Sequence, residues 1–176
     1  MVMNTVRIER WTAEQIGEAM PEFIELLRDG VDGGASIGFL PPLQDAIAHE
    51  FWSEIQADVA AGTRILIVAL LDGKMVGSAQ LGLAMRQNSR HRAEVQKVLV
   101  HSTYRRRGIG QQLMVELENQ AHLAKRTLLV LDTCRGDSGE PLYRKMGYIE
   151  AGVIPRYAEI ENGDFCDTVI YYKQLD

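Results

Sequence analysis

Cysteine is scarce in this sequence of 176 residues, which contains only Cys134 and Cys166. The pair shows no CxxC spacing, and no histidines surround either residue in the pattern of zinc ligands. The sequence therefore indicates neither a metal site nor a disulfide framework. We expect both cysteines to be ordinary reduced residues of a cytosolic protein.

Long apolar runs are also missing. No stretch approaches the roughly 18 consecutive apolar residues that a membrane-spanning helix needs. The first residues contain the charged Arg7, Glu9 and Arg10 and no apolar core of a signal peptide. We therefore expect a cytoplasmic protein with no membrane partner.

A basic excess is missing as well, since 19 Lys and Arg residues stand against 24 Asp and Glu residues, a net charge of −5. General nucleic-acid binding needs a broad basic face, so this balance argues against a nucleic-acid partner. Proline is rare, with 5 residues, and the 46% hydrophobic and 24% charged content is ordinary for a folded chain. The length fits one domain, residues 1–176, that can bury a real core.

A strand, a basic loop and a helix follow one another between Glu94 and Leu117. The strand is apolar at Val95 and from Val98 to Val100, and the helix is apolar at Leu113, Met114 and Leu117. The loop between them holds three arginines and two glycines. Unpaired backbone N–H groups in such a loop, and the positive end of the helix dipole, favour an anion such as a phosphate or pyrophosphate.

Periodicity and turn residues predict the order of the other elements. Asp72-Gly73 is typical of a tight hairpin, and a helix between two apolar strands indicates one parallel pair with a right-handed crossover. Thr12 and Gln15 form a capping-box pattern at the first helix. The predicted strands span 5–11, 64–71, 74–85, 94–100, 128–132, 148–160 and 165–173, and the predicted helices span 12–28, 43–61, 108–124 and 137–147.

The resulting fold class is α/β (α+β), with a mixed, mostly antiparallel sheet of about seven strands flanked by about four helices. The helix over 43–61 should bury one face, formed by Ala46, Ile47, Phe51, Ile55 and Val59. The segment Gly30–Pro42 is too rich in glycine for regular structure. It is either a lid over a substrate or a solvated connector.

This chain resembles the GNAT family of acetyl-CoA-dependent N-acetyltransferases. Arg105-Arg-Arg-Gly108-Ile-Gly110 matches the family's acetyl-CoA loop, [Gln/Arg]-x-x-Gly-x-[Gly/Ala], and the order of elements agrees along nearly the whole chain. More narrowly, Gly33–Phe39, Ala93–Lys97 and Leu131–Thr133 look like the tabtoxin-resistance acetyltransferases. His101 departs from the family, because many members carry proline there, and the loop should be less rigid.

The resemblance implies the GNAT fold, acetyl-CoA as cosubstrate and no metal. The acceptor would be the primary amine of a small molecule, an amino acid or an amino-acid-like antibiotic, which implies a role in antibiotic resistance. The pyrophosphate would lie on residues of the loop, and the pantetheine arm would pair with the backbone of the preceding strand. The implied acetyl-CoA residues are Val98, Leu99, Val100, Arg105, Arg106, Arg107, Gly108, Ile109 and Gly110.

Amine attack on a thioester needs a base for the ammonium, with a pKa of about 10.4, and a proton donor for the leaving thiolate. Glu94 and Asp132 are the candidate bases, and either one would accept the proton or only hold the ammonium by charge. Tyr143 matches the family's tyrosine beside the CoA sulfur and would donate to the thiolate. Ser36 and Phe39, with Glu94 and Asp132, are the candidate acceptor-binding residues.

Several alternatives stay open. A protein N-terminus or a lysine is the main competing acceptor, and an acyl-CoA sensor without catalysis is a different class of protein. A dinucleotide-binding oxidoreductase fits poorly, because Leu113 stands where the third glycine belongs. Free sheet edges often pair between subunits, so the last hairpin, ending Tyr171-Tyr172-Lys173, allows a homodimer.

Overall fold

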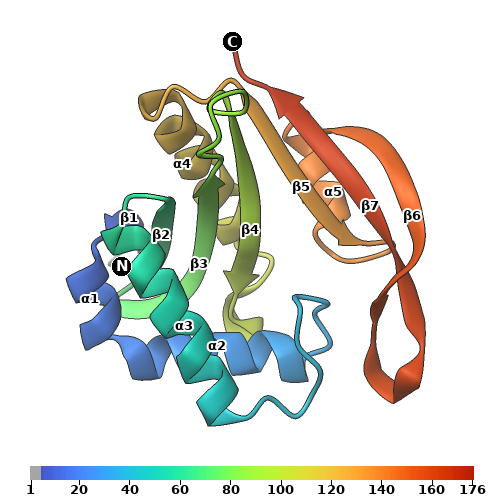
Figure 1. The fold of residues 1–176 in the computed structure, drawn as a ribbon. Helices are drawn as coiled ribbons and strands as arrows, with labels where there is room; N and C mark the ends of the chain where they lie inside the picture. The colour runs from blue at the N-terminus through green and yellow to red at the C-terminus, as the bar shows by residue number, and fades with distance from the viewer. Residues whose placement is uncertain (1–4) are drawn as a thin grey trace.

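The chain folds around one mixed sheet of seven strands in a computed structural model that describes residues 5–176 (Figure 1). Residues 1–4 of the predicted domain lie outside the described residues. The order across the sheet is β1-β2-β3-β4-β5-β7-β6, and only β4 and β5 are parallel. The strands are β1 (Val6–Trp11), β2 (Arg64–Leu71), β3 (Lys74–Leu83), β4 (Arg92–Val100), β5 (Leu128–Cys134), β6 (Ile149–Glu159) and β7 (Phe165–Gln174). The predicted fold class is confirmed.

The described residues form five α-helices rather than four, because the predicted first helix is interrupted at Ala19. Pro21 has no N–H to continue the first hydrogen-bond ladder, and it suits the first turn of a new helix. The predicted capping box of Thr12 and Gln15 is present. The helices are α1 (Ala13–Glu18), α2 (Met20–Asp32), α3 (Asp45–Ala60), α4 (Ile109–Leu123) and α5 (Glu140–Lys145), with 3-10 turns at Ser102–Tyr104 and Glu161–Gly163.

Each face of the sheet carries its own hydrophobic core. Helices α4 and α5 cover one face, and α1, α2 and α3 cover β2 to β4 on the other (Figure 1). The predicted buried face of α3 is partly wrong, because Ala48 and Trp52 join Ile55 in the core, while Ala46 and Ile47 are exposed. The aromatic residue of α2, Phe23, selects this face by packing on Trp52 with ring centroids 4.5 Å apart.

The last hairpin turns inward, so that β7 pairs with β5 on one side and with β6 on the other. Tyr171 to Lys173 pair with Leu129 to Leu131 of β5, so the free edge of the last hairpin is β6 and not the strand that ends in these residues. The ladder between β5 and β7 runs through all seven residues of β5. The edges of the sheet are β1 and β6.

Candidate active site

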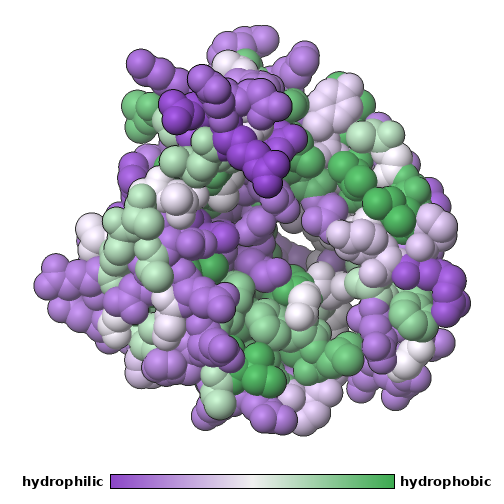
Figure 2. Space-filling model, in the orientation of Figure 1, coloured by the Kyte–Doolittle hydropathy of each residue, from purple (hydrophilic) through white to green (hydrophobic). Residues whose placement is uncertain are grey.

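The parallel strands β4 and β5 pair only over Arg92–Glu94 and Leu128–Val130. Beyond Glu94 the two strands diverge, and Figure 2 shows the surface hollowed between them. Val98, Leu99 and Val100, the predicted pantetheine strand, belong to the part of β4 that pairs only with β3. An extended ligand arm can pair with such an exposed strand edge.

A β-bulge in β4 lies beside this opening. Lys97 and Val98 oppose the single residue Ala79 of β3, and Lys97 adopts the left-handed φ of 47°. The extra residue inverts the alternation of side chains, so Val95 packs in the core under α4, whereas Leu99 packs in the core under α2. The bulge therefore turns the end of β4 and re-aims the Lys97 side chain.

The loop after β4 presents free backbone donors. In the part of the chain that the structure describes, no backbone N–H of residues 106–111 donates a hydrogen bond within the protein. The predicted positive φ is found at Gly108, at +76°, where it forms the N-cap of α4. These N–H groups and the helix dipole fit a pyrophosphate, the anion that the sequence predicts here.

Gly110 has no positive φ, and glycine serves close packing here instead. An added Cβ would lie 3.3 Å from Leu142 Cδ2 and 3.8 Å from Val100 Cγ2. Helix α4 therefore approaches β4 and α5 closely at this residue. Ile109 is buried in the core and anchors the start of the helix.

The three arginines of the loop have different surroundings. Arg105 turns back, because its Nε donates to the carbonyl oxygen of Val100 at 3.0 Å. The guanidinium of Arg107 lies 5.4 Å from the ring centroid of Tyr104. Arg106 adopts a φ of 60° and makes no hydrogen bond, ion pair or ring contact within residues 5–176. Arg106 is therefore the arginine most free to reach a ligand.

Asp29 of α2 holds the start of the loop. The backbone N–H of Ser102 donates to its carboxylate at 2.7 Å, and the Ser102 hydroxyl donates at 2.6 Å. His101 Nε2 lies 3.7 Å from the same carboxylate, and His101 Nδ1 accepts from the N–H of Thr103 at 3.3 Å. This network gives the loop a fixed start at the position where many GNAT members carry proline.

Glu94 and Asp132 line one cleft of about 250 Å³ on the face of the sheet opposite α4. Glu94 pairs in register with Val130, so Asp132 is two residues further along on the same face. Both carboxylates are exposed, and the Thr168 hydroxyl donates to Asp132 at 3.0 Å. The cleft is lined by Arg92, Glu94, Val130, Leu131, Asp132, Ile154, Tyr157, Thr168 and Ile170.

Tyr143 lies on the opposite face and belongs to α5. It packs in the first core against Tyr148 and Tyr171, with ring centroids 6.1 and 6.3 Å away. Burial raises the pKa of its phenol well above the usual value of 10, and the carboxylates of Asp137 and Asp132 raise it further. The phenol is therefore held protonated, which suits a hydrogen-bond donor.

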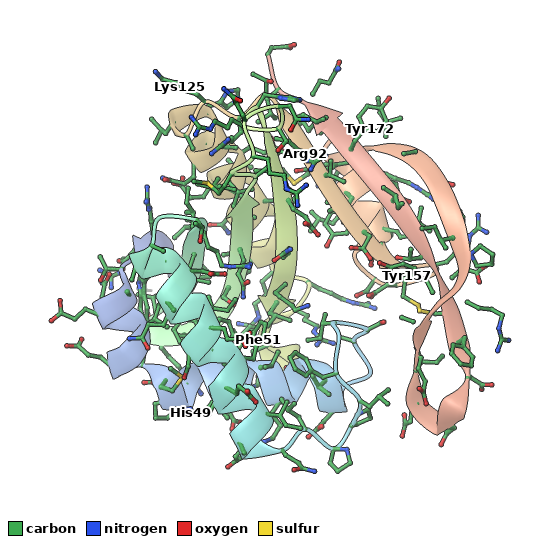
Figure 3. All side chains as sticks on the ribbon, viewed as in Figure 1. His49, Phe51, Arg92, Lys125, Tyr157 and Tyr172 are labelled. Atoms are coloured by element: carbon green, nitrogen blue, oxygen red, sulfur yellow. A yellow bond between two sulfur atoms is a disulfide. The ribbon has the colours of Figure 1, made fainter. Side chains whose placement is uncertain are left out.

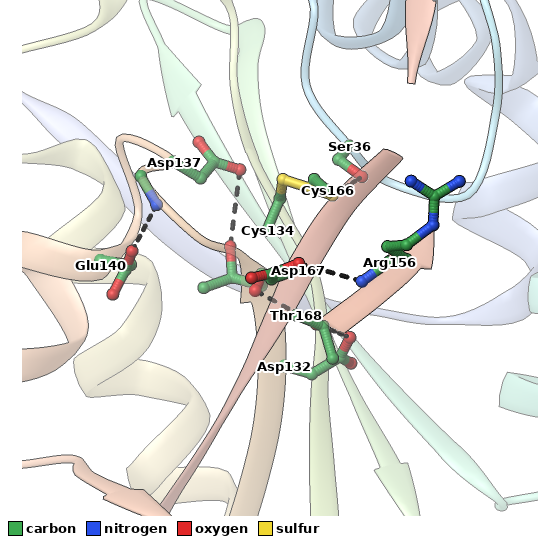
Figure 4. Close-up of a disulfide and its surroundings, with 11 residues drawn as sticks. Ser36, Asp132, Cys134, Asp137, Glu140, Arg156, Cys166, Asp167 and Thr168 are labelled. Atoms are coloured by element: carbon green, nitrogen blue, oxygen red, sulfur yellow. Dashed lines mark hydrogen bonds between the residues drawn. A yellow bond between two sulfur atoms is a disulfide. The ribbon is translucent and has the colours of Figure 1, made fainter. Parts of the chain in front are cut away.

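The two predicted loop residues do not line the cleft. Phe39 packs edge-to-face on Phe51 of α3, with centroids 5.3 Å apart, and its neighbour Ile37 packs in the second core. Ser36 Oγ lies 3.8 Å from Cys166 Sγ on β7, so the loop reaches across to the last hairpin (Figure 4).

Cys134 and Cys166 are joined by a disulfide, which corrects the expectation of two reduced residues (Figure 4). The bond joins neighbouring antiparallel strands at the end of β5 and the start of β7, with Cα atoms 5.9 Å apart. The residues are separated by 32 positions, and only the pairing of these strands brings them together.

Residue patterns in the sequence missed part of the cleft. Arg92 on β4 and Tyr157 on β6 come from opposite sides of the opening (Figure 3). Lys97 ends the motif Ala93–Lys97, and a lysine inside an apolar strand is itself a signal of a functional role. Arg92, Tyr157 and Thr168 carry no such signal, since only the order β4-β5-β7-β6 gathers them.

The sheet parts between its parallel strands next to a glycine-containing loop with free N–H groups, an arrangement that can hold an extended ligand arm and an anion side by side. Residues 62–150 match the family described as "Acetyltransferase (GNAT) domain". The chain belongs to the GNAT acetyltransferase family. Among residues 5–176, no helix has the length and apolar character to cross a membrane.

Individual proteins agree with this assignment. The chain is 28% identical over 141 residues to an uncharacterized N-acetyltransferase from the hisH–hisA intergenic region of Azospirillum brasilense, covering 79% of this chain and 82% of that one. A ribosomal-protein-alanine N-acetyltransferase from Brucella melitensis matches with a TM-score of 0.79, 24% identity and coverage of 96% and 99%. A phosphinothricin acetyltransferase from Sinorhizobium meliloti, in complex with acetyl-CoA, matches with a TM-score of 0.78, 20% identity and coverage of 97% and 89%. The similarity to the two solved structures concerns the fold.

Proposed function

We propose that this chain transfers the acetyl group of acetyl-CoA to the primary amine of a small molecule, an amino acid or an amino-acid-like antibiotic or toxin. The reaction would be direct attack in a ternary complex within one domain, residues 1–176, of a cytoplasmic enzyme. The observation that carries the proposal is the shared cleft of Glu94 and Asp132, which lies where β4 and β5 diverge.

The surroundings of the opening support acetyl-CoA as the acetyl donor. The free N–H groups of residues 106–111 would hold the pyrophosphate, with Arg106 placed to neutralise it. The unpaired edge of Val98, Leu99 and Val100 would align the pantetheine arm. Arg105 already donates a hydrogen bond to the Val100 carbonyl and so stabilises the loop. The backbone groups of Val98 and Leu99 would therefore be the ones that pair with the pantetheine arm.

The two faces of the sheet would supply a proton acceptor for the ammonium and a hydrogen-bond donor for the leaving thiolate. Glu94 or Asp132 would take the proton of the ammonium on the face of the cleft, directly or through water. The amine nitrogen then bonds to the thioester carbon and the C–S bond breaks. The nitrogen loses its second proton as the amide forms, and the CoA thiolate takes up a proton and leaves as the thiol. Tyr143 would donate a hydrogen bond to the thiolate from the other face, where its raised pKa keeps the phenol protonated.

The size of the cleft favours a small acceptor over a protein. A volume of about 250 Å³ suits a compact molecule, and a peptide needs a longer groove. Two carboxylates facing the opening favour an amine that arrives as a cation. An acyl-CoA sensor would need neither these carboxylates nor the buried Tyr143.

Release of CoA thiol tests the proposal. We expect acetyl-CoA with a panel of free amino acids and β-lactam amino-acid analogues to release thiol and yield the N-acetylated amine by mass spectrometry. Acetylation of peptide N-termini with no activity on small amines would show that the acceptor is a protein and that the proposed small-molecule acceptor is wrong. Tight acetyl-CoA binding with no turnover on either panel would indicate a sensor.

A further inference from the structure

The Lys97 ammonium lies beside the proposed acceptor site and takes no part in the mechanism above. The bulge in β4 gives Lys97 its left-handed φ of 47° and directs its side chain toward α3 and the loop after α2. Its Nζ lies 5.9 Å from the ring centroid of Phe51. A Cβ added at Gly38 would be 3.5 Å from the same nitrogen. The ammonium is thus held between a helix and a loop.

This cation lacks a fixed counter-ion. Within residues 5–176 Lys97 makes no hydrogen bond and no ion pair, although its side chain is half-buried. By contrast, Arg64 donates through Nε to Asp58 and through Nη1 to Gln80 and Gln96. A half-buried ammonium normally pairs with a carboxylate or reaches water, so its free donors are available to a bound anion.

Lys97 does not line the cleft itself, but it lies three residues beyond Glu94 on β4, and its ammonium is beside Phe51 of α3, which covers the same face of the sheet as the cleft. Burial lowers the pKa of Lys97, Asp132 and Glu94 oppose that effect, and Arg64 adds to it. The same two carboxylates line the cleft in which we place the acceptor amine. The site therefore offers negative charge for an ammonium and, next to it, an unpaired positive charge.

We propose that Lys97 is a specificity-determining residue that binds the carboxylate of the acceptor while Glu94 and Asp132 receive its amine. The acceptor is then a zwitterionic amino acid with a free carboxylate, which excludes a peptide N-terminus, whose carboxyl group is amidated. This inference rests on the proposed function, and it narrows the acceptor to one class.

Matched acceptors test this role. Each of the twenty protein L-amino acids is compared with its carboxamide, which keeps the amine and side chain but has no negative charge. In the unaltered enzyme we expect kcat/KM for the best amino acid to exceed kcat/KM for its amide by about 10- to 100-fold, because one charge-assisted hydrogen bond is lost with the amide. The difference should lie mainly in KM. Equal values for acid and amide would overturn the inference without any variant.

Lys97→Met separates recognition from catalysis. We expect the variant to lose the preference, so that the ratio of acid to amide falls to about one while the activity on the amide is kept. A loss that is equal for acid and amide would assign Lys97 a catalytic or structural role and overturn the inference. Lys125→Met, an exposed lysine far from the cleft, is the matched control, and acetyl-CoA affinity checks that Lys97→Met is folded.

Binding measured by calorimetry keeps this inference apart from the proposed function. Amino-acid binding that disappears in Lys97→Met, in an enzyme that releases no thiol, would support the carboxylate site and refute acetyl transfer. Thiol release with both amino acids and their amides, at the same ratio of acid to amide in the unaltered enzyme and in Lys97→Met, would support acetyl transfer and refute the role of Lys97.

Discussion

Asp29 of α2 accepts two hydrogen bonds from Ser102, one from its backbone N–H at 2.7 Å and one from its hydroxyl at 2.6 Å. The residues are 73 positions apart. Through this pair, a helix on one face of the sheet fixes the second residue after β4. The start of the proposed pyrophosphate loop is therefore set by α2 as well as by its own sequence.

Removing the contact between Asp29 and Ser102 should lower the affinity for acetyl-CoA and leave the rate of acetyl transfer unchanged. We expect Asp29→Asn and Ser102→Ala each to raise the dissociation constant of acetyl-CoA about three- to tenfold, with kcat nearly unchanged, because one or two hydrogen bonds are lost. Calorimetry on both variants and the double variant measures their coupling. Glu22→Gln, an exposed change on the same helix, is the control. Additive effects would mean that the pair does not hold the loop.

The two loop glycines should fail in different ways. Gly108→Ala should cost about 1–2 kcal/mol of stability, because its φ of +76° is strained for alanine, although the added Cβ meets nothing within 4 Å. Gly110→Val should abolish acetyl-CoA binding, because its Cβ already lies 3.3 Å from Leu142.

Thermal unfolding and calorimetry with acetyl-CoA measure both effects. Gly152→Val on β6 is the control, since its Cβ has open space and its φ is not positive. Normal acetyl-CoA binding by Gly110→Val would contradict the placement of the loop.

Tyr143→Phe should lower kcat about 10- to 100-fold and leave acetyl-CoA affinity largely unchanged, because one donor to the leaving thiolate is lost. The pKa of the phenol is raised by burial, so it stays protonated from pH 6 to pH 9. The loss should therefore be the same at every pH in this range. Initial rates of both forms at several pH values provide the measurement. If the ratio of kcat in the unaltered enzyme to kcat in Tyr143→Phe shrinks toward pH 9, the tyrosine ionises in this range. Unchanged turnover in the variant would remove Tyr143 from the mechanism.

Glu94→Gln and Asp132→Asn should identify the base. The variant that lacks the base should lose about 100-fold in kcat, whereas a residue that only holds the ammonium should mainly raise the KM of the amine. Thr168→Val, which removes the hydroxyl that donates to Asp132, separates the charge of Asp132 from its orientation. Steady-state kinetics with varied amine tests all three variants. Full activity of both carboxylate variants would exclude the proposed base chemistry.

Glu140 should make the stability of the protein depend on pH. The Tyr171 hydroxyl at 2.5 Å and the Gly136 N–H at 2.6 Å hold the pKa of this buried carboxyl below its usual value. A lowered pKa stabilises the fold above the unfolded pKa of about 4.3, and that stabilisation is lost as the pH falls. Glu140→Gln should cost about 1–3 kcal/mol at pH 7, from the hydrogen bonds of a buried charge.

Urea unfolding at pH 7 and near pH 4 measures this difference, which should shrink at the lower pH. Glu150→Gln is the matched control, because Glu150 also lies near Arg144 but is exposed. An equal cost of Glu140→Gln at both values of pH would refute the linkage.

Local patterns predicted most of the fold. The Asp72-Gly73 turn, the capping box at Thr12 and the strand from Arg64 to Leu71 are found where they were predicted. Each depends on neighbours within a few residues, where chain geometry and backbone hydrogen bonding are decisive. The burial of α3 was predicted less well, because its apolar residues surround the helix and tertiary contacts with Phe23 selected the face.

The sequence by itself indicated the family, the anion-binding loop that follows Arg105, and Glu94 and Asp132 as the two candidate carboxylates. These features lie within single elements or follow from the parallel pairing of β4 and β5. Only the tertiary structure decided the insertion of β7, the Cys134–Cys166 bond, the return of Arg105 to Val100 and the direction of Lys97. The physical reason is that packing of the whole chain sets which strands and cysteines pair across 32 or more residues, and it also sets where β4 forms its bulge. No local sequence pattern encodes either feature.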